Sequence, residues 1–122
     1  MKEQIPPILR PDQVKPIELS IFARHFDLAI DDNTEPAFLT GISMNTGDLR
    51  PGDLFVAMPG KKSHGANFAE KAIAQGAVAV VTDLAGQKIL GEVEVPVLLL
   101  ENPRAHLGEL AAFALLHLPT AT

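Results

Sequence analysis

Several residue types are missing from this chain of 122 residues, and each absence excludes a class of protein. Without cysteine, the chain forms no disulfide and offers no thiolate to a metal ion. Tryptophan and tyrosine are absent, and with only six phenylalanines we expect no stacking platform for nucleic acid. Basic residues form no run and the net charge is −5, which also disfavours nucleic-acid binding.

Long apolar stretches are also missing. No segment reaches the roughly 18 uninterrupted apolar residues of a membrane span. Residues 1–16 carry charges and four prolines instead of the apolar core of a signal peptide. We therefore expect a cytoplasmic protein without a membrane partner, and an extended or disordered beginning of the chain.

The residues that are present follow an α/β order. The length is that of one domain, and 47% of the residues are apolar, which is enough for a core. Helical spacing predicts a helix over 17–30, followed by an acidic connector over 31–36. Apolar runs predict strands over 39–43, 53–58, 77–81 and 95–100. The segments between and after these strands predict helices from Ser63 or Asn67 to Gln75, over 84–90, and over 104–118.

These elements predict an α/β fold, a small three-layer domain with a mixed, mostly parallel sheet. The direction of the strand that ends at Ser43 stays open. Gly76 is a natural stop for the helix before it. Asn102 is expected to cap the last helix, with Pro103 at its first position.

Two polar loops, 44–52 and 59–65, flank the apolar strand 53–58. Loops at strand ends are where open α/β sheets bind ligands, so we expect the two loops to share one crevice. Lys61, Lys62 and Ser63 precede a helix N-terminus, a place that suits an anion. From charge alone, a solvated basic turn is the stronger interpretation.

Other chemistry has less support in the sequence. The spacing from Gly52 to Lys62 does not match an ATP phosphate loop. No two histidines have the i, i+4 spacing that a zinc site on a helix would use. Asp53 begins a strand, and we expect it to pair with backbone groups rather than act with Asp48 in a hydrolase.

Two runs of sequence carry a family resemblance. The first is TGDLRPGDLFVAMPG, from Thr46 to Gly60, and the second is HGANF, from His64 to Phe68. They resemble the N-terminal domain of the Mur ligases, which build the cell-wall peptide. The resemblance extends from about Leu39 to Pro119 and is greatest to the member that adds the third amino acid to UDP-N-acetylmuramoyl-dipeptide. The alternatives are the sister ligase that adds D-Ala-D-Ala, and a non-catalytic scaffold or interaction module.

The resemblance implies that residues 37–122 bind the uridine diphosphate of the substrate and that residues 1–36 are an N-terminal extension and helix. It implies that Lys61, Lys62 and Ser63 line the uridine pocket. His64 is a possible ligand contact.

In the first loop, the family pattern Asp-Ser-Arg falls on Asn45, Thr46 and Gly47. Thr46 keeps a hydroxyl for the nucleotide, Asn45 is a possible contact, and Met44 would contact uracil. Gly47 loses the family arginine altogether, and glycine has no side chain to replace its salt bridges or anion contact. The alternative interpretation is a tight turn that needs Gly47 for a positive φ.

No catalytic residue and no metal ligand is expected in this chain. The resemblance implies that ATP and Mg²⁺ serve the full-length ligase through central and C-terminal domains, because the sequence stops before the family's phosphate loop. The expected partners are UDP-N-acetylmuramoyl-dipeptide and those domains, and we expect the fragment alone to be inactive.

Overall fold

The computed structural model describes residues 16–30 and 36–117, and the side chains of 115–117 are not described. The strands are β1 (Ile17–Glu18), β2 (Phe38–Leu39), β3 (Gly41–Ser43), β4 (Asp53–Ala57), β5 (Ala79–Thr82) and β6 (Val97–Leu99). The α-helices are α1 (Leu19–His25), α2 (Ala69–Ala74), α3 (Leu84–Leu90) and α4 (Leu107–His117). Two 3-10 helices, η3 (Gly65–Phe68) and η4 (Pro103–His106), lead into α2 and α4.

The central sheet has four parallel strands in the order β3-β4-β5-β6. All five residues of β4 are buried, as the apolar run predicts. β3 is parallel to β4, which decides the direction that the sequence leaves open. The predicted sheet was mixed, but the only antiparallel pairing among the described strands is that of β1 with β2. These two strands form a separate small sheet, and the main sheet is parallel throughout.

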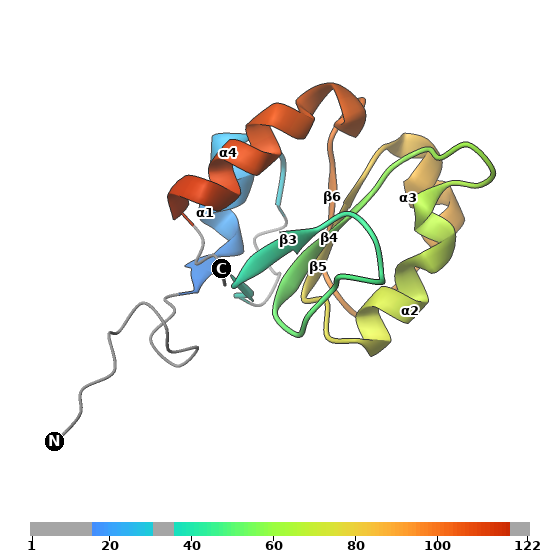
Figure 1. Ribbon diagram of the computed structural model, residues 1–122, viewed down its shortest axis with the longest axis horizontal. Coiled ribbons are helices and arrows are strands. Elements are labelled where there is room, and N and C mark those ends of the chain that lie inside the picture. The colour runs from blue at the N-terminus through green and yellow to red at the C-terminus, as the bar shows by residue number, and fades with distance from the viewer. Residues whose placement is uncertain (1–15, 31–35, 118–122) are drawn as a thin grey trace, which may run out of the picture.

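The sheet separates two cores, which makes the fold three-layered as predicted. Leu54 and Val56 of β4 face a core that α1 and α4 complete with Phe22 and Phe113. Phe55 faces a second core built from α2, η3 and the loop before β4. Figure 1 shows α1 and α4 on one side of the sheet and α2 and α3 on the other.

The first helix is shorter than the 17–30 that its spacing predicts. The first two residues of the predicted range, Ile17 and Glu18, form β1 and pair with β2. The helix α1 begins at Leu19 and ends at His25. Asp27 adopts φ +57°, and the amide of Leu28 donates to the carbonyl of Ala23 at 2.7 Å. This left-handed residue with a six-to-one hydrogen bond is a Schellman ending. The segments 1–15 and 31–35 lie outside the described residues.

The strand predicted over 39–43 is divided at Thr40. The Thr40 amide donates to the carbonyl of Gly52 at 3.0 Å instead of joining a ladder. Gly52 has φ +94°, and an added Cβ would lie 2.3 Å from the Thr40 hydroxyl oxygen. The chain therefore switches at this point from the small pair of strands to the main sheet.

Two helix beginnings also differ from the prediction. The helix expected from Ser63 or Asn67 begins with η3 at Gly65, and His64 occupies its cap. Asn102 precedes η4 in a left-handed conformation, φ +53°, and its side chain makes no cap hydrogen bond. Pro103 does take the first position, since its missing N–H is not needed there.

The remaining boundaries lie close to the prediction. α3 spans 84–90 as expected, and Gly76 ends the turn after α2 with φ +111°. β5 begins two residues late. The Ala77 amide donates back across the turn to the carbonyl of Ala72, and the Val78 amide makes the first bond to β4, at the carbonyl of Asp53. β6 is limited to 97–99, directly after Pro96.

Candidate functional site

The loop after β4 is a tight hairpin. The Gly65 amide donates to the carbonyl of Met58 at 2.7 Å, and the Gly60 amide donates to that of Ser63 at 3.0 Å. Pro59 and His64 form an antiparallel bridge between these two bonds. Only Lys61 and Lys62 remain at the tip, and we call residues 58–65 the lysine hairpin.

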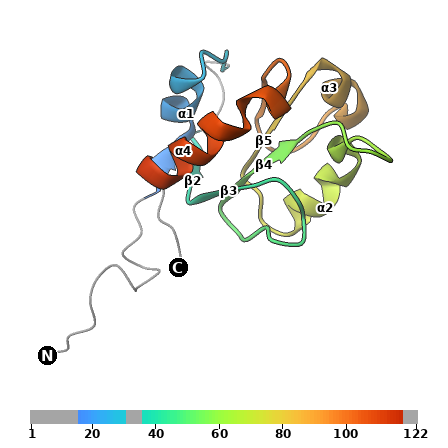
Figure 2. The ribbon, with the colours of Figure 1, turned by 45° about the horizontal axis from the view of Figure 1, so that its top comes forward.

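Glycine is required at the neck of the lysine hairpin. A Cβ on Gly60 would lie 2.7 Å from the Ser63 carbonyl oxygen. Lys61, Lys62 and Ser63 are exposed. In Figure 2 the loop beyond the arrowhead of β4 extends outward before the chain turns back toward α2. The sequence prediction of an exposed cationic loop at the carboxyl end of β4 is met by this geometry.

Two neighbouring elements hold the base of the lysine hairpin. Nη2 of Arg104, in η4, donates to the carbonyl oxygen of Pro59 at 2.6 Å. On the other side, Nε2 of His64 and Oδ1 of Asp83 lie 2.8 Å apart. Asp83 follows β5 and caps α3, so the hairpin is fastened at the carboxyl ends of β5 and β6.

Both nitrogens of His64 are used inside the protein. Nδ1 accepts from the Ala66 amide at 2.9 Å, so the proton shared with Asp83 is on Nε2. The His64 side chain is only 10% exposed. His64 therefore caps η3 and ties it to α3, a structural role that the sequence analysis did not assign to it.

Asp83 is held as a carboxylate. Burial alone would raise the pKa of Asp83, but the Gly86 amide and the His64 ring both donate to Oδ1. These bonds outweigh the burial and lower the pKa below its ordinary value. The charge of Asp83 is therefore part of the connection between the lysine hairpin and α3.

The first loop is fastened to a different helix. Nε2 of Gln75, just after α2, donates to the Thr46 carbonyl oxygen at 3.0 Å. Oδ1 of Asn45 accepts from the Asp48 amide at 2.9 Å, which closes the turn. Met44 and Asn45 are exposed and Thr46 is half-buried. The structure thus ties the two loops to separate elements, and the shared crevice stays a prediction.

Gly47 does not have the conformation that the tight-turn interpretation requires. The positive-φ glycines of the described residues are Gly52, Gly76 and Gly91, so a need for positive φ at Gly47 is wrong. A Cβ on Gly47 would meet only Oδ1 of Asn45, at 3.2 Å. A side chain fits at this position after a small shift of an exposed neighbour.

Asp53 pairs with its own surroundings, as predicted. Its Oδ2 accepts from the Ser43 hydroxyl at 2.8 Å and from the Arg50 amide at 2.9 Å. The residue is only 7% exposed. The carboxylate thus joins the end of β3 to the beginning of β4 and is not placed for acid–base chemistry.

The described residues do not fit ATP or Mg²⁺. Gly60 belongs to a two-residue hairpin rather than to a long loop that wraps a phosphate chain. Within 16–30 and 36–117, no three acidic, histidine or cysteine side chains gather where they could hold a metal ion. No helix in these ranges is long and apolar enough to cross a membrane.

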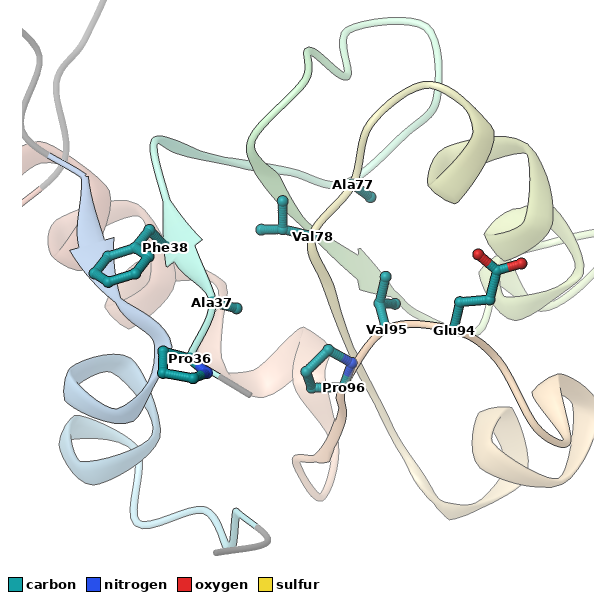
Figure 3. Close-up of a pocket in the computed structure, with 8 residues that line it drawn as sticks. All are labelled: Pro36, Ala37, Phe38, Ala77, Val78, Glu94, Val95 and Pro96. Carbon is teal, nitrogen blue, oxygen red and sulfur yellow. The ribbon is translucent and has the colours of Figure 1, made fainter. Parts of the chain in front are cut away.

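A hollow of about 610 Å³ lies at the opposite edge of the sheet. Figure 3 shows its eight lining residues, which precede β5 and β6 or belong to the segment around Phe38. Glu94 is the one charged residue among them, and its carboxylate would repel a diphosphate. None of the site residues predicted from the sequence lines this hollow.

Sequence reasoning missed Arg104 and Asp83 as parts of the site. Asp83 was recognisable as an N-cap, because it stands between a buried strand and a helix. Its bond to His64, 19 residues earlier, has no local signal. The contact from Arg104 to Pro59 spans 45 residues and depends on η4 beginning where it does.

The fold and these loops define a three-layer α/β domain with polar loops at the carboxyl edge of a parallel sheet, where such folds bind ligands. The chain belongs to the Mur ligase family: the family model described as "Mur ligase family, catalytic domain" matches residues 39–114. This finding confirms the resemblance and the α/β fold class.

Named relatives agree with the family. The chain is 40% identical over 103 residues to a UDP-N-acetylmuramoyl-L-alanyl-D-glutamate–2,6-diaminopimelate ligase of Streptomyces coelicolor, which covers 84% of this chain. It is 34% identical over 108 residues, 88% of this chain, to a UDP-N-acetylmuramyl-tripeptide synthetase of Leifsonia xyli. The chain spans only 20% and 21% of the length of these two relatives.

A solved structure shares the fold. The UDP-N-acetylmuramoylalanyl-D-glutamyl-2,6-diaminopimelate–D-alanyl-D-alanyl ligase of Acinetobacter baumannii matches with a TM-score of 0.58. The match covers 82% of this chain and 22% of that structure, at 17% sequence identity. At this identity the likeness supports the fold alone.

Proposed function

We propose that this chain is the uridine-diphosphate-anchoring part of a ligase that adds the third residue to UDP-N-acetylmuramoyl-dipeptide in peptidoglycan synthesis. The observation that carries the proposal is the 40% identity to a diaminopimelate ligase over 84% of the chain. The proposed full-length enzyme is cytoplasmic and forms an amide bond at the expense of ATP. The ATP and Mg²⁺ sites are assigned to domains outside these residues, and the fragment alone is proposed to be inactive.

The lysine hairpin supplies the charge in this proposal. Lys61 and Lys62 contact the diphosphate, and Ser63 donates a hydrogen bond at the side of the tip. Charge-assisted hydrogen bonds of this kind contribute about 1.5–3 kcal/mol each when well formed. His64 holds the loop in shape through its bonds to Ala66 and Asp83.

The first loop supplies the base and sugar contacts. Met44 is 38% exposed and offers an apolar surface to uracil. Thr46 presents a hydroxyl, and Gln75 fixes the backbone there. Asn45 is a further contact. The uridine-binding unit is residues 37–122, with 1–36 as an N-terminal extension and helix.

Holding the uridine end serves the chemistry at a distance. Binding energy gained far from the reacting carboxylate positions that carboxylate in the rest of the enzyme. The partners of this chain are accordingly the UDP-linked dipeptide and the domains that complete the ligase. The names of the relatives favour the third-residue reaction over D-Ala-D-Ala addition, because the D-alanyl-D-alanyl ligase of Acinetobacter baumannii is similar in fold at 17% identity.

The test is a titration of the protein with UDP and with UDP-N-acetylmuramic acid, followed by backbone amide NMR shifts. The proposal expects shifts clustered at Met44–Thr46 and Lys61–Ser63. Shifts confined to the hollow around Phe38 and Val95, or none at millimolar ligand, would contradict it and favour a scaffold without a nucleotide site.

Gly47→Arg adds a second arm to the same experiment. The position accepts a side chain, and the new cation stands where the family has arginine. We expect about tenfold tighter UDP binding and little change for Gly47→Gln, which adds similar bulk without charge. Equal affinities of the two variants would mean that the first loop does not face the diphosphate.

A further inference from the structure

Arg104 occupies a position that the sequence does not reveal. It lies in η4, directly after β6, two strands away from β4 in the sheet. Its Nη2 nevertheless reaches the Pro59 carbonyl oxygen, at 2.6 Å. The guanidinium is therefore placed at the base of the lysine hairpin, on the arm that carries Pro59, whereas Asp83 binds His64 on the other arm.

The guanidinium of Arg104 has most of its hydrogen-bonding capacity left. Arginine carries five N–H donors, and one of them is used by Pro59. The residue is exposed, and no carboxylate among the described residues forms an ion pair with it. An arginine fixed at one nitrogen and open at the others is suited to an anion with paired oxygens.

Charge is unevenly distributed around this place. The chain has 15 acidic residues against 10 lysines and arginines, so cations are in the minority. Two of those ten, Lys61 and Lys62, form the tip of the lysine hairpin, and a third, Arg104, contacts its base. Gly47 carries no charge, and the one cation of the first loop, Arg50, lies at its far end next to Asp53. Arg104 adds a positive group beside the lysine hairpin itself.

We propose that Arg104 is a third cationic residue of the nucleotide site and binds the diphosphate together with Lys61 and Lys62, an inference that rests on the uridine-diphosphate site proposed above. Its bond to Pro59 holds the guanidinium in place before the ligand arrives. The ligand class is a nucleoside diphosphate, and the diphosphate is the part that Arg104 recognises.

The experiment compares uridine with UDP on the 122-residue protein and on the variants Arg104→Gln and Arg104→Lys, by amide NMR titration. Arg104→Gln should weaken UDP binding about tenfold and leave uridine affinity within about twofold. Arg104→Lys should lie between, because it keeps the charge and loses the planar fork. The matched control is Arg24→Gln in the last turn of α1, an exposed arginine on another part of the molecule.

Each result has one meaning. If Arg104→Gln binds UDP as tightly as the unaltered protein, Arg104 is outside the site, although the nucleotide site itself stands. If uridine and UDP weaken equally, Arg104 only braces the hairpin and the inference is overturned. If the unaltered protein binds neither ligand, the proposed function fails and this inference fails with it.

Discussion

At the residue scale, the least predictable connection is the bond between His64 and Asp83. Each residue caps a helix of its own: His64 accepts from the Ala66 amide, and Asp83 accepts from the Gly86 amide. The 2.8 Å contact between them converts two local caps into one junction. A cap at Asp83 was recognisable from its place between a strand and a helix, but a side-chain bond across 19 residues depends on how η3 and α3 pack.

Asp83→Ala should destabilise the fold by about 1–2 kcal/mol at pH 7, because the cap of α3 and the acceptor for His64 are both lost. The pKa of Asp83 is lowered on folding, so its charge contributes stability fully above the unfolded pKa near 3.8. That contribution disappears as the pH falls through the lower, folded pKa. Urea unfolding between pH 7 and pH 3 measures the change.

Asp83→Asn is the matched control for this pH dependence. The amide keeps an oxygen that accepts from both Gly86 and His64, but it does not titrate. The difference in free energy of unfolding between Asp83→Asn and the unaltered protein should become smaller as the pH falls from 7 to 3. A cost of Asp83→Ala that is the same at pH 3 as at pH 7 would show that the carboxylate charge contributes nothing.

At the scale of elements, glycines in two helices have opposite roles. Gly86 lies in α3, where an added Cβ would stand 1.8 Å from the Thr82 hydroxyl oxygen and 2.7 Å from Cε1 of His64. Gly108 lies in α4 with no atom within 4 Å of such a Cβ. In the sequence both look alike, as weak helix positions.

The two alanine substitutions should therefore change stability in opposite directions. Gly86→Ala should cost about 1–3 kcal/mol, since Thr82 is buried and cannot move aside. Gly108→Ala should add up to about 1 kcal/mol, because alanine loses less entropy in a helix. Thermal or urea unfolding of both variants is the measurement. A stabilising Gly86→Ala would mean that α3 does not approach β5 this closely.

The elements that the sequence predicted well are those whose limits are local. The continuous apolar run of β4 and the residues flanking α3 contain the needed information themselves. α1 was predicted too long because its end depends on Asp27 in a left-handed conformation, which glycine more often adopts. The split at Thr40 depends on a bond to Gly52, which a local pattern does not contain.

The same division applies to the candidate site. The cationic tip at Lys61 and Lys62 was visible as a pattern, because a glycine and a short polar run between strand and helix indicate a loop. Arg104 was not visible, because its place at the hairpin depends on the order of strands in the sheet. A local sequence pattern does not predict tertiary contacts of this kind.

At the scale of the whole molecule, chain order and strand order coincide. The strands β3 to β6 are neighbours in sequence and in the sheet. When parallel strands follow one another in order, right-handed crossovers place all the connecting segments on the same face of the sheet. Here the residues of η3, α2 and the loop before β4 share one core on that face. The other face must then be covered by α1 and α4, which lie outside that series.

The contact between these two helices should be energetically coupled. The rings of Phe22 and Phe113 meet edge to face with centroids 5.2 Å apart. A double-mutant cycle with Phe22→Leu and Phe113→Leu should give a coupling of about 0.5–1.5 kcal/mol by urea unfolding.

Phe22 with Phe55 is the control pair, because these side chains lie in different cores. Their substitutions should add to within about 0.5 kcal/mol. An additive result for Phe22 and Phe113 as well would mean that α1 is an appendage instead of a part of the domain's cooperative unit.

The position of α4 also determines the order in which the domain can be completed during synthesis. By the time residue 100 has left the ribosome, the core under α2 can close through contacts that are near in sequence. The face that carries Leu54, Val56 and Leu98 stays without its second helix until Phe113 has emerged. A nascent chain therefore displays a half-covered apolar sheet from the time β6 has emerged until Phe113 has emerged, and that interval is when this domain most needs protection from aggregation.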